Sequence, residues 1–170
     1  MSDVYLSRCL KTLRSWDAPL TGWRCVETYD TKGEGEMSGL ATCELCGCTA
    51  VRFVHVMGHD DHFELFKVRC ECAGVMEGDL MAAKDRERLV RNRAGRKRRF
   101  ALLEWGTSGN GNKTLRHKGK RVTIIRSKFG GFGVVFDGAT VWRYRDRRIM
   151  DMRTAVLAAF DLIDPPVKAR

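Results

Sequence analysis

The sequence lacks any long apolar run, because none of its 170 residues belongs to an uninterrupted apolar segment of 18 or more. A helix needs about 20 mostly apolar residues to cross a bilayer, so we expect no membrane-spanning segment. The start of the chain, MSDVYLSRCLKTLRSW, also lacks the apolar core of a secretion signal and carries charges instead. We therefore expect a cytoplasmic protein, in which clustered cysteines are metal ligands more often than disulfides.

Acidic residues are scarce in the middle of the chain. Residues 80–121 hold 14 Lys and Arg against 3 Asp and Glu, whereas residues 1–79 hold 8 against 13. The formal net charge of +10 therefore arises mainly from one central stretch. This asymmetry predicts a localised surface that binds a polyanion.

The apolar pattern of the first part predicts a mixed α+β domain over residues 1–105. Apolar residues recur at helical spacing over 3–16, and WRCVETYD (23–30) has the composition of a strand. Two apolar, β-branched or aromatic runs over 51–57 and 62–69 flank the polar GHDD, which predicts a hairpin. A helix is expected to begin near Val75 and to continue to about Trp105.

Residues 106–120, GTSGNGNKTLRHKGK, are polar and rich in glycine and asparagine, so they are the predicted linker. Three short strand patterns follow, RVTIIRS, GFGVVF and TVWRYR, and they are joined by GG and DG turn signals. The apolar segment TAVLAAFDLI predicts a closing helix. The sequence thus predicts a β-β-β-α domain over residues 121–170, and no internal repeat is visible.

Two cysteine pairs carry the strongest functional signal. Cys43-x2-Cys46 is followed by Gly47, which tolerates the left-handed turn of a zinc knuckle, and Cys70-x-Cys72 comes 23 residues later. With a hairpin between the pairs and a helix after them, the arrangement resembles a zinc-ribbon or treble-clef module. The predicted cofactor is a Zn²⁺ ion bound by all four thiolates, which is a closed and therefore structural site.

Several alternatives remain open for these side chains. One alternative is a set of buried thiols without metal, because free cysteine is often a core residue. Cys48 is a possible substitute ligand, whereas Cys9 and Cys25 are expected to pack in the core. The sequence also leaves open whether a histidine replaces a cysteine ligand, and the candidates are His55, His59 and His62.

The histidines between the cysteine pairs are similar to those of metal-dependent nucleases of the His-Asn-His type. In those enzymes cysteine knuckles flank a ββ-metal motif, and the resemblance implies His55 as general base with Asp61 or His62 as metal ligand. Such sites need a further His or Asn on the next helix, and no histidine follows Cys72 before His117. A packed His55 and a solvated hairpin tip are the simpler interpretation.

The segment KDRERLVRNRAGRKRRF (84–100) places nine cations on the predicted helix, with no acidic residue between Glu87 and Glu104. Like charges at this density repel one another, and phosphate is the anion that most often relieves such repulsion. A merely solvated helix would usually mix the two signs. The candidate nucleic-acid contacts on this helix are Arg91, Arg93, Arg96, Lys97, Arg98 and Arg99.

The predicted third strand adds Arg143 and Arg145, which alternate with Trp142 and Tyr144 and so share one face. Three strands packed on an alanine-rich helix resemble the DNA-reading domains of plant ethylene-response factors and of integrase arms. That resemblance implies a sheet that lies in the major groove with a helix behind it. The two arginines are therefore further candidate nucleic-acid contacts.

Residues 40–100 also resemble a group of bacterial and phage zinc-ribbon-like proteins. These share a CxxCG knuckle, a later CxCAG and a following arginine-rich helix, although they have histidine where this chain has Val75. Taken together, the predicted function is non-catalytic, zinc-stabilised binding of DNA or RNA. The alternatives are a phage-type inhibitor or accessory protein that binds a host nucleic-acid-processing complex, and the nuclease.

Overall fold

The computed structural model describes residues 3–33 and 39–166, and it is a mixed α+β structure with antiparallel sheets. The described residues form two compact units, one up to Ala94 and one over Gly95–Pro166, which we call the N-terminal and C-terminal units. The predicted division at 105 differs, because the last turns of a long helix group with the second unit. Residues 34–38 and 167–170, which fall within the predicted domains, lie outside the described residues.

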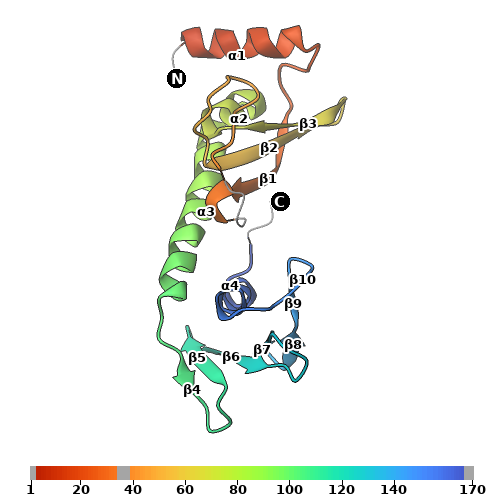
Figure 1. Cartoon of the computed structure of the whole chain (residues 1–170). Coiled ribbons are helices and arrows are strands. Elements are labelled where there is room, and N and C mark those ends of the chain that lie inside the picture. Colours follow the sequence, from red (N-terminus) through yellow and green to blue (C-terminus); the bar gives the residue numbers. More distant parts are fainter. Residues whose placement is uncertain (1–2, 34–38, 167–170) are drawn as a thin grey trace. The chain divides into compact units, whose positions relative to one another are not determined.

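The N-terminal unit is a three-stranded antiparallel sheet with helices around it (Figure 1). Its elements are α1 (Asp3–Ser15), β1 (Arg24–Asp30), the 3-10 turn η1 (Thr31–Gly33), β2 (Phe53–His59), β3 (His62–Val68), α2 (Cys70–Glu77) and the first part of α3 (Leu80–Ala101). The predicted first helix, first strand and hairpin are confirmed, and β2 is the central strand, pairing with both β1 and β3. All but the last residue of β2 are buried, which fits its nearly continuous apolar sequence.

The predicted single helix from 75 to 105 is wrong, because two helices occupy this part of the chain. The first, α2, begins at Cys70 and ends where Gly78 adopts a left-handed conformation with φ of 77°. Asp79 then starts α3, since its Oδ1 accepts a hydrogen bond from the backbone N–H of Ala82 at 2.9 Å. Glycine commonly ends a helix and aspartate commonly caps the start of one, so the pair Gly78-Asp79 separates two helices.

The C-terminal unit is built on a five-stranded antiparallel sheet of order β4-β5-β6-β7-β8, with a small β9-β10 pair beside it. Its elements after α3 are β4 (Gly106–Thr107), β5 (Lys113–His117), β6 (Lys120–Arg126), β7 (Phe132–Phe136), β8 (Ala139–Val141), β9 (Arg143–Tyr144), β10 (Arg147–Arg148) and α4 (Met152–Ile163). The predicted third strand is divided, because Trp142 separates β8 from β9.

The predicted linker, 106–120, instead forms β4 and β5. Residues Lys113 to His117 pair in register with β6, and the two strands are joined by a tight turn at Lys118 and Gly119. Both turn residues have positive φ, 49° and 77°, which is the geometry of a two-residue hairpin. The polar, glycine-rich composition therefore marks a hairpin at the edge of the sheet.

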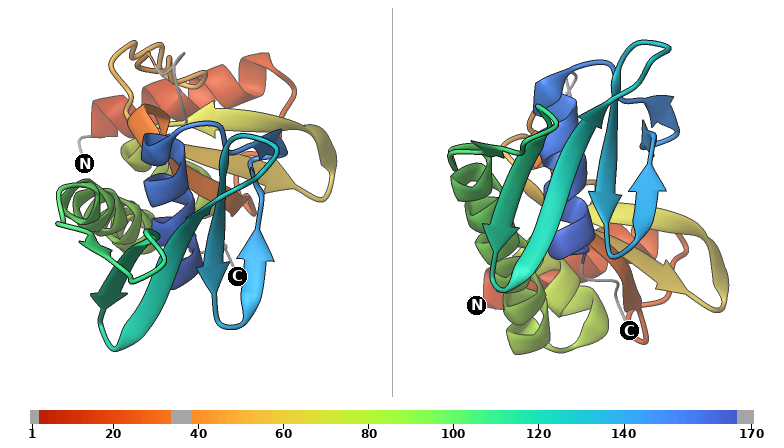
Figure 2. Two further views of the ribbon diagram at one scale, coloured as in Figure 1. Left: turned by 60° about the horizontal axis from the view of Figure 1, so that its bottom comes forward. Right: turned by 90° about the horizontal axis from the view of Figure 1, so that it is seen from below.

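Helix α4 lies against β6 and β7 and closes the core of the C-terminal unit (Figure 2). Asp151 caps its N-terminus by accepting the backbone N–H of Thr154 at 2.8 Å. Its apolar face packs with β6 and β7 in a cluster whose fully or nearly fully buried members include Phe100, Val122, Ile124, Val134, Ala159 and Phe160. Among the helices described, none is both long enough and apolar enough to cross a membrane.

The closeness of α2 to the start of α3 provides a test of the N-terminal unit. A Cβ added at Gly74 would lie 2.7 Å from Cα of Leu80, so Gly74→Ala requires a backbone shift. We expect the free energy of unfolding to fall by about 1–3 kcal/mol in urea denaturation. Gly95→Ala is the control, since its Cβ would meet only a side-chain atom of Arg99 at 3.9 Å and alanine favours helix. Equal effects of the two substitutions would contradict the close packing.

Candidate metal centre and basic surface

Two groups of side chains in the described part of the chain are placed so that each could hold a metal ion. One is Cys43, Cys46 and Cys72, and the other is His55, Cys70 and Glu87; within each group the potential ligand atoms lie within 4.8 Å of one another. Three of the four predicted ligands are thus brought together. Cys70 is placed in the other group.

The separation of Cys70 from Cys72 follows from helical geometry. Both residues lie in the first turn of α2, where each step rotates the side chain by about 100° around the helix axis. Residues two apart therefore point to opposite sides and cannot both reach one ion. Two cysteines in a Cys-x-Cys sequence can bind the same ion where the backbone is extended or forms a turn. The sequence predicts a helix only from Val75, whereas α2 begins at Cys70, so the helical position of both cysteines was not predicted.

The knuckle at Cys43 has the geometry that its sequence predicts. The backbone N–H of Gly47 donates to the carbonyl of Cys43 at 2.8 Å, and the N–H of Cys43 donates to the carbonyl of Cys48 at 2.7 Å. Gly47 has a φ of 74°, the left-handed conformation that glycine adopts without strain. These bonds close a tight turn that presents Cys43 and Cys46 to α2.

The sulfur atoms of this group lie at distances that suit tetrahedral zinc. Four sulfurs bound about 2.3 Å from zinc would be about 3.8 Å apart, and Sγ of Cys43 lies 3.4 Å from Sγ of Cys72. The backbone N–H of Arg69 also donates to Sγ of Cys43 at 3.4 Å. The hydrogen bond from Cys72, supported by the backbone N–H groups of Arg69 and Cys46, lowers the pKa of Cys43 to about 5 despite its burial. The same hydrogen bond raises the pKa of Cys72, so at neutral pH a Cys43 thiolate faces a protonated Cys72 thiol, whose proton a bound metal ion would displace.

Helix α1 brings two further polar side chains to the thiols. The hydroxyl of Tyr5 lies 2.8 Å from Sγ of Cys72, and Nε of Arg69 donates to the same hydroxyl at 3.4 Å. Cys9, one helical turn after Tyr5, is completely buried in the same core. Burial raises the pKa of its thiol, whereas hydrogen bonds with Tyr5 and Cys72 oppose that rise. The prediction that Cys9 packs in the core is confirmed, and its spacing of four from Tyr5 places both side chains on the face of α1 that meets Cys72.

In the second group His55 and Cys70 are buried and Glu87 is half-buried, so the neutral forms of the thiol and the imidazole are favoured. Burial and the charge of Glu87 raise the pKa of Cys70 to about 12, and burial together with the charge of Arg86 lowers the pKa of His55 to about 4. Nδ1 of His55 lies 3.3 Å from Oγ1 of Thr28. Its Nε2, 3.8 Å from the carboxylate of Glu87, has no hydrogen-bond partner among the described residues. A neutral histidine faces a neutral thiol beside one carboxylate.

The residues of the nuclease interpretation are not assembled into one site. The side chain of His55 is completely buried, whereas that of Asp61 is 89% exposed at the tip of the β2–β3 hairpin. His62 packs its ring on Phe66 at 5.3 Å between ring centres and meets the edge of Trp23. His59 also packs against Trp23. These contacts give two of the three hairpin histidines a packing role.

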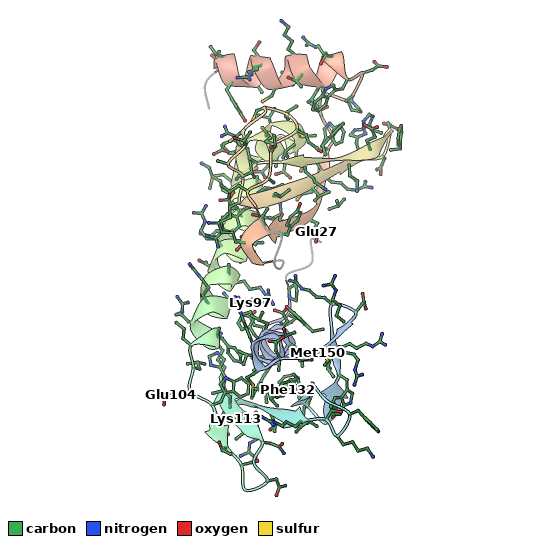
Figure 3. All side chains as sticks on the ribbon, in the orientation of Figure 1. Glu27, Lys97, Glu104, Lys113, Phe132 and Met150 are labelled. Carbon is green, nitrogen blue, oxygen red and sulfur yellow. The ribbon has the colours of Figure 1, made fainter. Side chains whose placement is uncertain are left out.

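Two of the cations predicted to contact nucleic acid pair with carboxylates in α4 and directly after it. Arg96 donates to both oxygens of Asp164, at 2.6 and 3.2 Å. Nζ of Lys97, which Figure 3 labels, lies 3.0 Å from Asp161 and 3.1 Å from the hydroxyl of Tyr144. These pairs attach the end of α3 to α4 within the C-terminal unit.

The other predicted helix cations differ in exposure. Arg91 pairs with Glu87 and lies over the ring of Phe53 at 5.2 Å, and Arg93 is half-buried. Arg98 and Arg99 are exposed. Within the described residues no carboxylate pairs with either of the last two, so they are the helix cations best placed to meet a phosphate.

The β9-β10 pair concentrates four further arginines. Arg143 and Arg148 lie opposite one another in the pairing, although like charges directly opposite destabilise a sheet. The turn between the strands places Arg145 and Asp146 at positive φ, 50° and 62°, a conformation that costs free energy for residues other than glycine. All four arginines, including Arg147, are exposed. This hairpin, residues 143–148, is the most concentrated exposed basic element of the C-terminal unit.

Comparison of the chain with models of protein families, with curated proteins and with solved structures finds no match. The site is therefore interpreted from its own residues.

The half-buried pairing of Lys97 with Asp161 gives a test of which cations stabilise the fold. Replacing Lys97 by Met leaves Asp161 without its cation, and we expect the free energy of unfolding to fall by about 1–3 kcal/mol. Arg98→Met, at the neighbouring exposed position, is the control and should change it by less than about 0.5 kcal/mol. Urea denaturation followed by circular dichroism measures both. If Lys97→Met leaves the free energy of unfolding unchanged, Lys97 is not structural and is again a candidate contact with nucleic acid.

Proposed function

We propose that this chain is a non-catalytic nucleic-acid-binding protein, with a zinc ion that stabilises its N-terminal unit and a C-terminal unit that contacts phosphates. The observation that carries the proposal is the division of charge between the units. Residues 95–166 hold 16 Lys and Arg against 6 Asp and Glu, whereas residues 1–94 hold 13 against 15. A field of one sign over a small unit attracts polyanions and accelerates their association.

The exposed arginines of the C-terminal unit support phosphate groups as the anions that it binds. Arg98, Arg99 and the arginines of the 143–148 hairpin are exposed, and Arg143 and Arg148 repel one another across the strand pair. Guanidinium groups bind phosphate oxygens in pairs of hydrogen bonds, so a phosphate between such arginines relieves the repulsion. Arg96 and Lys97 already pair with carboxylates. The proposed phosphate contacts are therefore Arg98 and Arg99 near the end of α3 and the arginines of the 143–148 hairpin.

The proposed metal is zinc, held by Cys9, Cys43, Cys46 and Cys72. Three of these thiols are already within 4.8 Å of one another, and Cys9 is the fourth thiol that interacts with Cys72. Four thiolates form a closed tetrahedral site, which is a structural site and leaves no position for a reacting water. The order of knuckle, hairpin and helix supports a treble-clef-like module, in which α1 completes the ligand set.

A protein partner is the second candidate, favoured by exposed apolar side chains on the sheet of the N-terminal unit. Val26 and Leu65 come together above Gly58, where both lie within 3.3 Å of a Cβ added at that glycine. They are 40% and 56% exposed, and Phe63 on the same strand as Leu65 is 91% exposed. Such a patch suits an accessory protein or inhibitor that binds a host nucleic-acid-processing complex.

The zinc content of cysteine variants distinguishes the proposed ligand set, which includes Cys9, from the set predicted from the sequence, which includes Cys70. Cys9→Ser and Cys72→Ser should each weaken zinc binding by more than about 10-fold, since even changes outside the first ligand shell cost about 10–100-fold. Cys70→Ser should retain zinc, and Cys25→Ser is a control outside both groups. Atomic absorption after dialysis against a competing chelator gives the stoichiometry. Loss of zinc from Cys70→Ser but not from Cys9→Ser would contradict the proposed ligands.

The salt dependence of binding tests the phosphate contacts. The double variant Arg143→Ala/Arg147→Ala should lower the slope of log affinity against log salt by about 1.8 on duplex DNA, since each contact contributes about 0.9. Lys11→Ala/Arg14→Ala removes two exposed cations of α1 and is the matched control with an unchanged slope. Fluorescence anisotropy at several salt concentrations measures both. If the unmodified protein binds neither DNA nor RNA at low salt, the proposed function is wrong.

A further inference from the structure

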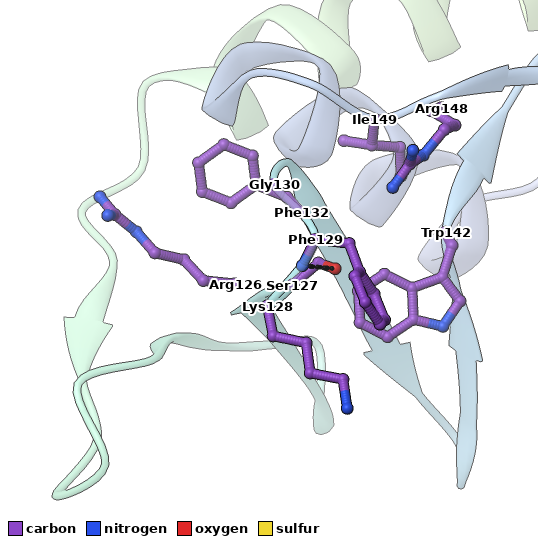
Figure 4. Close-up of a pocket in the computed structure, with 9 residues that line it drawn as sticks. All are labelled: Arg126, Ser127, Lys128, Phe129, Gly130, Phe132, Trp142, Arg148 and Ile149. Carbon is purple, nitrogen blue, oxygen red and sulfur yellow. Dashed lines mark hydrogen bonds between the residues drawn. The ribbon is translucent and has the colours of Figure 1, made fainter.

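We infer that the C-terminal unit contains a pocket for an unpaired base of a single-stranded nucleic acid. The inference rests on the proposed function and narrows its substrate from nucleic acid in general to a single strand. The pocket has a volume of about 640 Å³, within the range of small-molecule sites. It lies between the turn that joins β6 to β7 and the segment that carries Trp142 and Arg148 (Figure 4).

Partly exposed aromatic side chains line this pocket. Phe129 is 76% exposed and Trp142 is 44% exposed, while the half-buried Phe132 forms a further part of the wall. Large exposed rings gain little where they are, because their apolar surface remains in water. A base that stacks on such a ring removes both surfaces from water, and it does so whatever its identity.

Trp142 is held in a fixed position by the strand beneath it. A Cβ added at Gly133 would lie 2.6 Å from Cζ3 of the indole, so the ring rests directly on the backbone of β7. The carbonyl of Trp142 accepts the N–H of Ile149 at 3.2 Å, and the carbonyl of Ile149 accepts the N–H of Phe132 at 2.8 Å. An indole fixed in this way loses little conformational entropy when a ligand stacks on it.

The turn that carries Phe129 is also ordered by hydrogen bonds. The N–H of Phe129 donates to Oγ of Ser127 at 3.1 Å, and the N–H of Gly130 donates to the carbonyl of Ser127 at 3.2 Å. The N–H of Ser127 in turn donates to the carbonyl of Gly131 at 3.1 Å. These bonds fix the backbone from which Phe129 projects at the border of the pocket (Figure 4).

The cations of the pocket match a phosphate backbone. Its nine lining residues include Arg126, Lys128 and Arg148 but no carboxylate, which favours an anionic ligand. Nζ of Lys128 lies 5.1 Å from the centre of the Phe129 ring, so charge and aromatic surface occur side by side. Rings for bases beside cations for phosphates are the combination that binds single strands, whereas a duplex offers no exposed base faces.

The test compares oligonucleotides that share phosphates but differ in bases. The intact protein is titrated into labelled strands of about 12 nucleotides, a length within known single-strand site sizes. The probes are single-stranded DNA, single-stranded RNA, blunt duplex DNA and an abasic strand of the same length. The variants are Phe129→Ala/Trp142→Ala, the ring-retaining Trp142→Phe, and Phe63→Ala as an exposed aromatic control outside the C-terminal unit.

We expect the intact protein to bind the DNA or RNA single strand about 10-fold or more tightly than the abasic strand. The double alanine variant should lose that difference while its affinity for duplex and abasic strands stays unchanged, which also shows that the variant is folded. Trp142→Phe should retain most of the difference, because it keeps a ring for stacking. Phe63→Ala should bind as the intact protein does.

The failures of the two proposals have different signatures. If the intact protein binds all probes alike and the double alanine variant does the same, the pocket is not a base site, although nucleic-acid binding stands. The exposed rings would then be assigned to a protein partner. If the intact protein binds none of the probes at low salt, the proposed function itself is overturned, and this inference with it.

Discussion

The contact between the sulfur atoms of Cys43 and Cys72 is the interaction on which the N-terminal unit depends. It joins a knuckle to a helix that lies 24 or more residues later in the chain, across the intervening hairpin. Tyr5 and Cys9 then attach α1 to the same point. A metal ion held by this cluster would bind only when these segments meet, and its binding free energy would then add to that of folding. The same segments also share the apolar core of this unit, which includes Leu13, Val54 and Met57.

The elements with strong periodic or alternating patterns could be predicted from the sequence. The first helix, the β2–β3 hairpin and α4 have clear apolar spacing, and the continuous apolar run of β2 fits its buried position between β1 and β3. The break at Gly78 and Asp79 was available as a stop and start signal but was outweighed by the charged helical pattern on both sides. The strand at 113–117 has few large apolar residues, and only its pairing with β6 in the folded chain makes it a strand.

The candidate metal site could be predicted only in part. The knuckle is a local motif, so Cys43 and Cys46 could be identified from spacing alone, and Cys72 from the second pair. The choice between Cys70 and Cys9 depends on the phase of one helix and on where another helix packs. Charge has the same limitation: the sequence locates the basic stretch, but the carboxylates that pair with Arg96 and Lys97 are more than 60 residues away, in α4 and directly after it. Local composition therefore cannot separate cations that stabilise the fold from cations that meet solvent.

The indole of Trp142 and the bare backbone of Gly133 form a single unit of structure, since any side chain at 133 would occupy the space of the ring. The two positions are consequently not free to vary independently. In chains that descend from the same ancestor, a residue larger than glycine at 133 would require the loss of the large ring at 142. Joint change of this pair, rather than the constancy of either residue alone, is the evolutionary trace that this part of the C-terminal unit is expected to leave.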